Sequence, residues 1–203
     1  MIKKTILSLS LVTLLAVDIY PLLADTNPVF AQNFNSITTL SPRMREAIIQ
    51  QISVEQSSSN LYLTFASYFG DLGLDGCEAF FRDSSAEETQ HALLFFNLLI
   101  DRGEKFQLKA VNESTLMPTS PLDAFTKLME NEVQVTRAIH NLYTIALEEK
   151  DYATQAFLHP FLLMQVQEEK EAEDLLRLLS LGPNDPAVIL AFDYKLQEMV
   201  EKD

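Results

Sequence analysis

The sequence has little of what a disulfide-stabilised, cysteine-ligated or nucleic-acid-binding protein needs. It has a single cysteine, Cys77, so no disulfide can form within the chain and no cysteine cluster can bind zinc or an iron–sulfur group. Basic residues number 15 against 29 acidic ones, and the net charge of −14 would repel the phosphates of nucleic acids. Tryptophan is absent, and only five glycines occur in 203 residues. Long stretches without helix breakers favour an all-α protein over a β fold with many turns.

The N-terminal segment lacks the length of a membrane span. Two lysines precede an uncharged run (residues 5–17) that Asp18 ends, and a spanning helix needs about 20 apolar residues. This pattern is typical of a signal peptide. We expect residues 1–31 to be a signal or targeting peptide cleaved after Ala31, which would leave no stable membrane span, with residues 22–24 as a poorer cleavage site. The resulting prediction is export to a periplasm or a thylakoid-type lumen, and the alternatives are an uncleaved anchor, a misassigned start codon and a cytoplasmic protein.

The rest of the sequence predicts one helical domain, residues 41–203, after a polar lead-in at residues 32–40. Serine followed by proline, a common pair at helix starts, occurs at residues 41–42 and 120–121. We expect Gly70 to end the first helix and Asp75 to cap the second. The spacing of apolar residues, with the positions of glycine and proline, predicts helices at residues 42–69, 76–102, 121–150, 152–180 and 186–202.

Loop lengths predict how these helices are arranged. Short connections join the first helix to the second and the third to the fourth, so each pair is expected to form an antiparallel hairpin. The connection over residues 104–120 is long enough to cross the length of a bundle. We therefore predict a four-helix bundle with one long crossover between the second and third helices and a short fifth helix. The fifth helix is too short to be stable alone, and it either caps the bundle or packs at a subunit contact.

Acidic side chains interrupt the apolar faces of all four long helices. In chain order these residues are Glu55, then Glu88 with His91 three residues later, then Glu132 and Glu168. A buried carboxylate is costly unless it is paired or binds a metal, and few basic residues lie on these faces. Two ferrous ions would neutralise the four negative charges, and oxygen and nitrogen ligands suit iron, although zinc or manganese would also bind. The sequence thus predicts a two-metal carboxylate site inside the bundle.

The motifs around these residues resemble those of ferritins. Glu88-x-x-His91 on the second helix and Gln165-x-x-Glu168 on the fourth are together similar to the ferroxidase centre of prokaryotic ferritins. Further ferritin-like segments lie at residues 60–62, 80–92 and 151–154. Each motif alone is common, but together they occur in the right order on four helices. The resemblance covers residues 41–203 and indicates a non-haem ferritin.

This resemblance implies a role for each candidate residue. One iron would be held by Glu55, Glu88 and His91, and a second by Glu88 as a bridge with Glu132 and Glu168. Tyr62 and Gln165 would lie next to the centre, where Tyr62 can orient ligands or donate an electron. The implied substrates are Fe(II) and dioxygen or peroxide. Fe(III) would be stored as mineral inside a homo-oligomeric shell of about 24 subunits.

At two kinds of position this sequence departs from the patterns of related families, and these departures bear on haem and on a third iron site. Thr89 and Gln90 occupy the interval where bacterioferritins carry a haem-binding methionine, so no haem is expected. The positions of a third iron site in some bacterial ferritins correspond to Glu87, Met164, Gln167 and Glu168, two of which lack a carboxylate. Two other functions remain open: a di-iron oxidase or oxygenase that acts on an organic substrate without a shell, and an inert metal-binding bundle.

Overall fold

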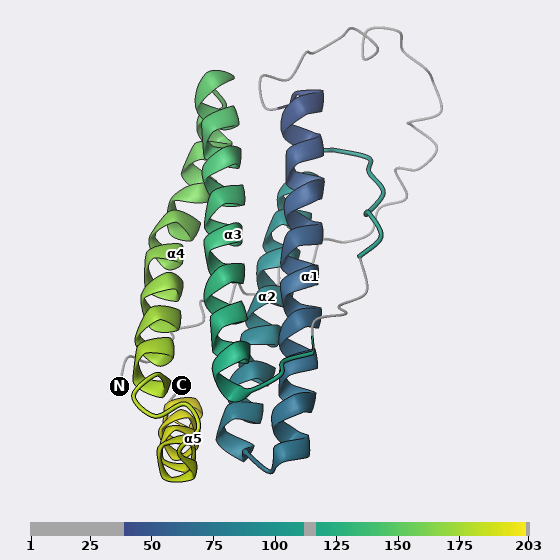
Figure 1. Cartoon of the computed structure of the whole chain (residues 1–203). Coiled ribbons are helices and arrows are strands. Elements are labelled where there is room, and N and C mark those ends of the chain that lie inside the picture. Colours follow the sequence, from purple (N-terminus) through teal and green to yellow (C-terminus); the bar gives the residue numbers. More distant parts are fainter. Residues whose placement is uncertain (1–38, 112–116, 202–203) are drawn as a thin grey trace, which may run out of the picture. The chain divides into compact units, whose positions relative to one another are not determined.

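The computed structural model describes residues 39–111 and 117–201, and the described chain forms five α-helices and no strand. The helices are α1 (Pro42–Leu72), α2 (Asp75–Asp101), α3 (Pro121–Glu148), α4 (Tyr152–Leu179) and α5 (Pro186–Val200). α1 packs along α2, α3 packs along α4, and α1 also contacts α3 (Figure 1). The predicted all-α bundle of two helical hairpins is therefore confirmed. The predicted signal peptide and most of the lead-in lie outside the described residues.

The connection between the two hairpins lies beside α1. Lys109 in this connection pairs with Glu46, their Nζ and Oε1 atoms 2.5 Å apart, and donates a hydrogen bond of 2.9 Å to Gln50. Both partners belong to the N-terminal half of α1. From there the chain must reach the start of α3, where Ala124 and Phe125 pack in the same cluster as Phe69 near the C-terminal end of α1. The connection thus crosses the length of the bundle, as the loop length predicts.

Local sequence determines most helix starts. The Ser41 hydroxyl accepts a hydrogen bond from the backbone N–H of Met44, and Ser120 does the same for Asp123. Each serine satisfies one of the free N–H groups of the first turn. The side chain of Asp151 caps α4 in the same way. Pro160 lies inside α4 and neither ends the helix nor shifts its start.

Two predicted helix boundaries are wrong. α1 does not end at Gly70 but continues to Leu72, and Gly73 takes the left-handed conformation (φ 69°) that ends the helix. The absent side chain at Gly70 instead leaves room for Glu78 of α2, whose carboxylate would lie 3.1 Å from a β-carbon there. Asp75 is the first residue of α2 and not its cap. Its charge still favours the helix, because it lies at the positive end of the helix dipole.

The core consists of two apolar clusters with a polar layer between them. One cluster joins the C-terminal half of α1 and the end of α4 to the starts of α2 and α3 and to α5. It is rich in aromatic rings, and Phe81 lies at its centre, in contact with Phe65, Phe69 and Phe125. The other cluster joins the opposite halves of the four long helices. The candidate metal-binding residues of the four long helices fall between these clusters in the sequence of each helix.

The fifth helix caps the bundle at the start of α2. Phe192 and Leu196 of α5 are buried in the aromatic cluster. The carboxylate of Asp193 accepts a 2.8 Å hydrogen bond from the backbone N–H of Cys77, a free N–H of the first turn of α2. This approach requires glycine at position 76, since a β-carbon there would lie 2.0 Å from the carbonyl oxygen of Asp193. Of the two expected roles of this helix, the structure supports capping. Within the described residues, no helix is long and apolar enough to cross a bilayer.

Candidate metal centre

Buried carboxylates form the polar layer at the middle of the bundle. Glu55 of α1 is fully buried, and Glu88 of α2 and Glu132 of α3 are 5% and 4% exposed. Glu168 of α4 is half-buried. The helical repeat turns these side chains inward, because each continues the row of apolar residues that faces the core.

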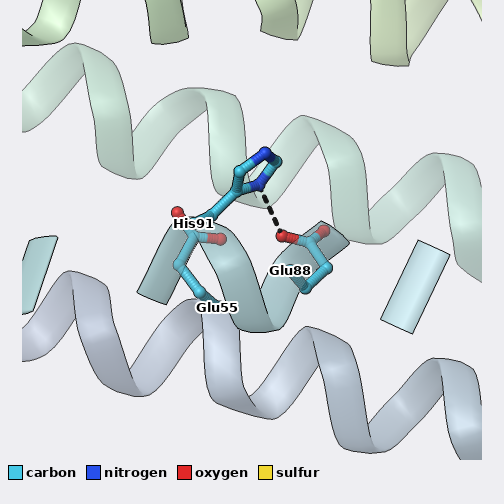
Figure 2. A group of neighbouring side chains, drawn as sticks. All are labelled: Glu55, Glu88 and His91. Carbon is cyan, nitrogen blue, oxygen red and sulfur yellow. Dashed lines mark hydrogen bonds and ion pairs between the residues drawn. The ribbon is translucent and has the colours of Figure 1, made fainter. Parts of the chain in front are cut away.

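Three potential ligand atoms converge between α1 and α2. Glu55, Glu88 and His91 each offer one atom within 4.8 Å of the others, and the three side chains point toward one another (Figure 2). His91 Nδ1 lies 3.1 Å from Glu88 Oε2. The spacing of three residues on α2 produces this pair, because residues i and i+3 are neighbours on a helix surface.

Glu55 carries a feature that fits a bound cation. Its Oε1 atom accepts a 2.8 Å hydrogen bond from Nε2 of Gln51, one helical turn earlier. Its Oε2 atom is buried and has no hydrogen-bond partner among the described residues. A buried carboxylate oxygen without a partner is costly, and a metal ion shared with the neighbouring carboxylate and imidazole would satisfy it. The donor set of carboxylate oxygen and imidazole nitrogen suits iron, zinc or manganese.

The two carboxylates of the other hairpin face a cavity next to this group. The cavity measures about 240 Å³, and its walls include Glu88, His91, Tyr62, Glu132 and Glu168. Among the described residues that line it, none is a lysine or an arginine. The negative charges are therefore not neutralised by basic side chains on the cavity wall. Five of the seven residues predicted from the sequence thus border one cavity, and Glu55 joins them through its contact with Glu88 and His91.

Burial makes the charged form of these carboxylates unfavourable. Burial, followed by the charge of Glu88, raises the pKa of Glu55 well above its ordinary value. Burial likewise raises the pKa of Glu88, to which the charge of Glu132 adds. The pKa of Glu168 is raised to about 7, mainly by burial and then by the charge of Glu132. Burial thus favours the protonated form of these groups when no cation is bound, and a metal ion would have to compete with protons for them.

Tyr62 is placed to act on Glu132. The ring is buried, and its hydroxyl donates a hydrogen bond to Glu132 Oε1. The hydroxyl oxygen accepts a 2.9 Å hydrogen bond from Nδ2 of Asn131. Burial, followed by the charge of Glu132, raises the pKa of Tyr62 well above its ordinary value. The phenol therefore keeps its proton and serves Glu132 as a hydrogen-bond donor.

Gln165 is buried but lies apart from the cavity. Its Oε1 atom accepts a 2.8 Å hydrogen bond from the hydroxyl of Thr136 on α3. It lines a separate pocket between α3 and α4, together with His140 and Glu169. The structure thus places Gln165 near Glu168 along the helix but directs its carbonyl oxygen to Thr136.

Several residues of this region were not singled out from the sequence. Gln51 orients Glu55, and its signal was available, because a polar residue four positions away lies on the same helix face. Asn131 had no such signal beyond its place next to Glu132. The remaining cavity wall includes Asp83 and Glu171, with Met199 and Val200 from the end of α5, and Glu87, which the sequence indicated as a position of a possible third iron site. Only the packing of α5 on the bundle brings Met199 and Val200 to the cavity.

Comparisons with known proteins show the family of this chain. The ferritin-like domain family matches residues 45–182. The chain is 37% identical over 139 residues to a bacterial non-heme ferritin of Bacteroides fragilis, a match that covers 67% of this chain and 86% of the relative. It is 31% identical over 157 residues to a bacterial non-heme ferritin of Staphylococcus aureus, which covers 77% of this chain and 95% of the relative.

Solved structures show the same fold. A ferritin of the archaeon Archaeoglobus fulgidus, described as a novel open-pore ferritin, superposes with a TM-score of 0.76 and 40% sequence identity. That match covers 78% of this chain and 98% of the archaeal chain. A form of this archaeal ferritin that was engineered to be closed superposes with a TM-score of 0.75. The family match, the two bacterial relatives and the shared four-helix bundle agree, and the chain therefore belongs to the ferritin family.

Proposed function

We propose that this protein is a ferritin subunit that oxidises Fe(II) at the buried carboxylate centre and passes Fe(III) to a mineral store. The observation that carries the proposal is the convergence of Glu55, Glu88 and His91, with one buried Glu55 oxygen that lacks a partner. The cavity beside this group supplies further carboxylates, and no lysine or arginine is among its described lining residues. Family membership supports iron as the metal.

The ligands divide naturally between two ions. Glu55, Glu88 and His91 would hold the first, and Glu132 and Glu168 would hold the second with Glu88 shared between them. Four carboxylates then balance two divalent ions, which removes the cost of burying four negative charges. Oxidation of two Fe(II) releases two electrons. With two protons, these electrons convert one dioxygen to hydrogen peroxide, or one hydrogen peroxide to two waters.

The protein's own residues would position the ions. The two apolar clusters flank the polar layer, and Glu55, which is fully buried, lies farthest from bulk water. Gln51 holds one oxygen of Glu55 and leaves the other for the metal. Tyr62 does the same for Glu132. Gln165 lies apart from the cavity and would act on the centre only indirectly, through the turn of α4 that it shares with Glu168.

Stopped-flow absorbance tests this proposal. Protein that begins at Gln32 is mixed with increasing Fe(II) in air, and a fast phase should saturate near about two irons per chain, as expected of a two-metal carboxylate site. Glu88→Ala should lose the fast phase, because Glu88 contributes to both ions. Glu130→Gln, at an exposed position of α3, provides a matched loss of one charge and should keep it. Absence of a fast phase above buffer autoxidation would refute the ferroxidase function.

Storage requires an assembly, and we propose a hollow homo-oligomer of about 24 subunits. The chain supports this through its five-helix length, since it covers 98% of the archaeal ferritin. Gel filtration should show one large species that retains Fe(III) after iron loading in air. A monomer or dimer with fast oxidation would instead indicate a di-iron oxidase or oxygenase that does not store iron, and a protein without oxidation would indicate an inert metal-binding bundle.

We also propose that residues 1–31 form a signal peptide that is removed during export. The lysine pair and the uncharged run that follows support this. Mass spectrometry of the protein isolated from its own cells should find Gln32 at the N-terminus, in a periplasmic or lumenal fraction. A cytoplasmic protein that retains the first 31 residues would contradict it.

A further inference from the structure

We infer that Asn131 is a positioning residue that directs the hydroxyl hydrogen of Tyr62 onto Glu132 and thereby orients this carboxylate for metal binding. The inference rests on the proposed function, because the orientation of Glu132 matters to the chemistry only if the centre binds metal. Asn131 belongs to none of the motifs that indicate the family. It precedes Glu132 on α3 and is half-buried.

The side chain of Asn131 bridges α3 to α1 through two hydrogen bonds. Its Nδ2 atom lies 2.8 Å from the hydroxyl oxygen of Ser58 and 2.9 Å from the hydroxyl oxygen of Tyr62. Ser58 and Tyr62 lie four residues apart on α1, so both face the same side of that helix. One amide group therefore reaches two hydroxyls on adjacent turns.

The hydrogen bonds made by these two hydroxyls determine which end of the Asn131 amide faces them. A hydroxyl has one hydrogen to donate and lone pairs to accept with. The hydrogen of Ser58 goes to the backbone carbonyl of Val54, 3.2 Å away, and that of Tyr62 goes to Glu132. As long as Glu132 accepts the Tyr62 hydrogen, both oxygens accept from Asn131, and only the NH₂ end of the amide can donate to both.

Asn131 in turn determines where the Tyr62 hydrogen can point. A phenol hydrogen rotates to suit its surroundings, and an N–H donor on one side of the oxygen excludes the hydrogen from that side. The remaining direction leads to Glu132 Oε1. One oxygen of Glu132 is then held by Tyr62, which leaves the other for a cation. Hydrogen bonds behind a ligand orient it in this way in many metal sites, and their loss weakens metal binding.

Infrared spectroscopy of the metal-free protein tests the first step. With ring-labelled tyrosine, the difference between the wild type and Tyr62→Phe isolates the C–O stretching band of Tyr62. Asn131→Leu removes the amide at similar volume and should shift this band, because the phenol loses a donor. Asn141→Leu makes the same replacement at an exposed position of α3 and should leave it unchanged. An unshifted band in Asn131→Leu would overturn the inference.

Metal titration tests the second step without redox chemistry. With Zn(II) as the probe, Asn131→Leu should weaken the binding of the second ion about three- to tenfold, the effect of losing one neutral hydrogen bond, and leave the first ion unchanged. In a Tyr62→Phe background the same substitution should cause no further loss, since Asn131 acts through the Tyr62 hydroxyl. An equal loss in both backgrounds would overturn the inference and indicate a packing effect.

The outcomes separate this inference from the function on which it rests. Wild-type protein that binds neither Zn(II) nor Fe(II) would refute the proposed function, and the inference with it. Wild-type protein that binds two ions while Asn131→Leu binds them equally well would refute the inference alone. If circular dichroism shows that Asn131→Leu does not fold, Asn131→Ala removes the same donor without adding bulk, and the same results are expected of it.

Discussion

Replacing Glu88 by glutamine should stabilise the metal-free protein and at the same time abolish its rapid iron oxidation. Glutamine has nearly the same shape as glutamate, so the cavity beside Glu88 keeps its walls. What changes is the charge. Glu88 is 5% exposed and is surrounded by carboxylates, and the folded protein must keep it protonated or bury its charge.

The magnitude follows from the pKa of Glu88, which burial raises from 4.5 to about 8. Because the folded-state value is the higher one, the folded state binds a proton that the unfolded chain releases, and stability is lost as the pH rises from 4.5 toward 8. Each pH unit in this range costs about 1.4 kcal/mol. The cost is on the order of a few kcal/mol at pH 7 and much smaller at pH 5, and glutamine removes it.

Urea unfolding of the metal-free protein measures this difference. At pH 7 and one fixed protein concentration, Glu88→Gln should unfold at a higher urea concentration than the wild type, and at pH 5 the two should nearly coincide. Glu130→Gln, an exposed glutamate on α3, removes the same charge and should shift the midpoint little at either pH. Stopped-flow absorbance of the same samples should show that only Glu88→Gln lacks the fast oxidation phase.

Two results would refute the reasoning, each at a different point. A Glu88→Gln protein that is no more stable than the wild type at pH 7 would show that burial of this carboxylate carries no such penalty. A variant that is more stable but oxidises iron at the wild-type rate would show that Glu88 is not a ligand. The first result concerns the electrostatics of the polar layer, and the second concerns the assignment of the site.

Three further perturbations probe the bundle and its centre. Gly76→Ala should lower the free energy of unfolding by about 2–4 kcal/mol, because the added methyl group would collide with the backbone of Asp193. Gly70→Ala is the control, since its methyl group would meet only the end of a flexible side chain and should be neutral or stabilising. The urea midpoints of the two variants measure the difference. Phe81→Ala should cost about 3–5 kcal/mol in the same assay, since it empties the centre of the aromatic cluster, and a loss under about 1 kcal/mol would contradict that packing. Zn(II) should raise the midpoint of thermal unfolding more at pH 7 than at pH 5, because protons compete with the metal for carboxylates whose pKa is raised. Equal shifts at the two pH values would argue against proton displacement.

Helix starts show what could be predicted locally. Ser41 and Ser120 cap α1 and α3 as their place before proline predicts, because a cap needs only contacts within one turn. The end of α1 shows the limit. Gly70 and Gly73 are both plausible terminators in the sequence, and only the structure shows that Gly73 takes the left-handed conformation that ends the helix.

In the candidate centre, too, some features follow from the local sequence and others from tertiary packing. The sequence by itself determined which carboxylates face the core, because the helical repeat decides the face of a helix that each residue occupies. Only the tertiary structure decided that Glu55 meets Glu88 and His91, that Gln165 turns to Thr136, and that α5 reaches the cavity wall. These contacts join segments far apart in the chain, and their geometry depends on how whole helices pack, which no local pattern encodes.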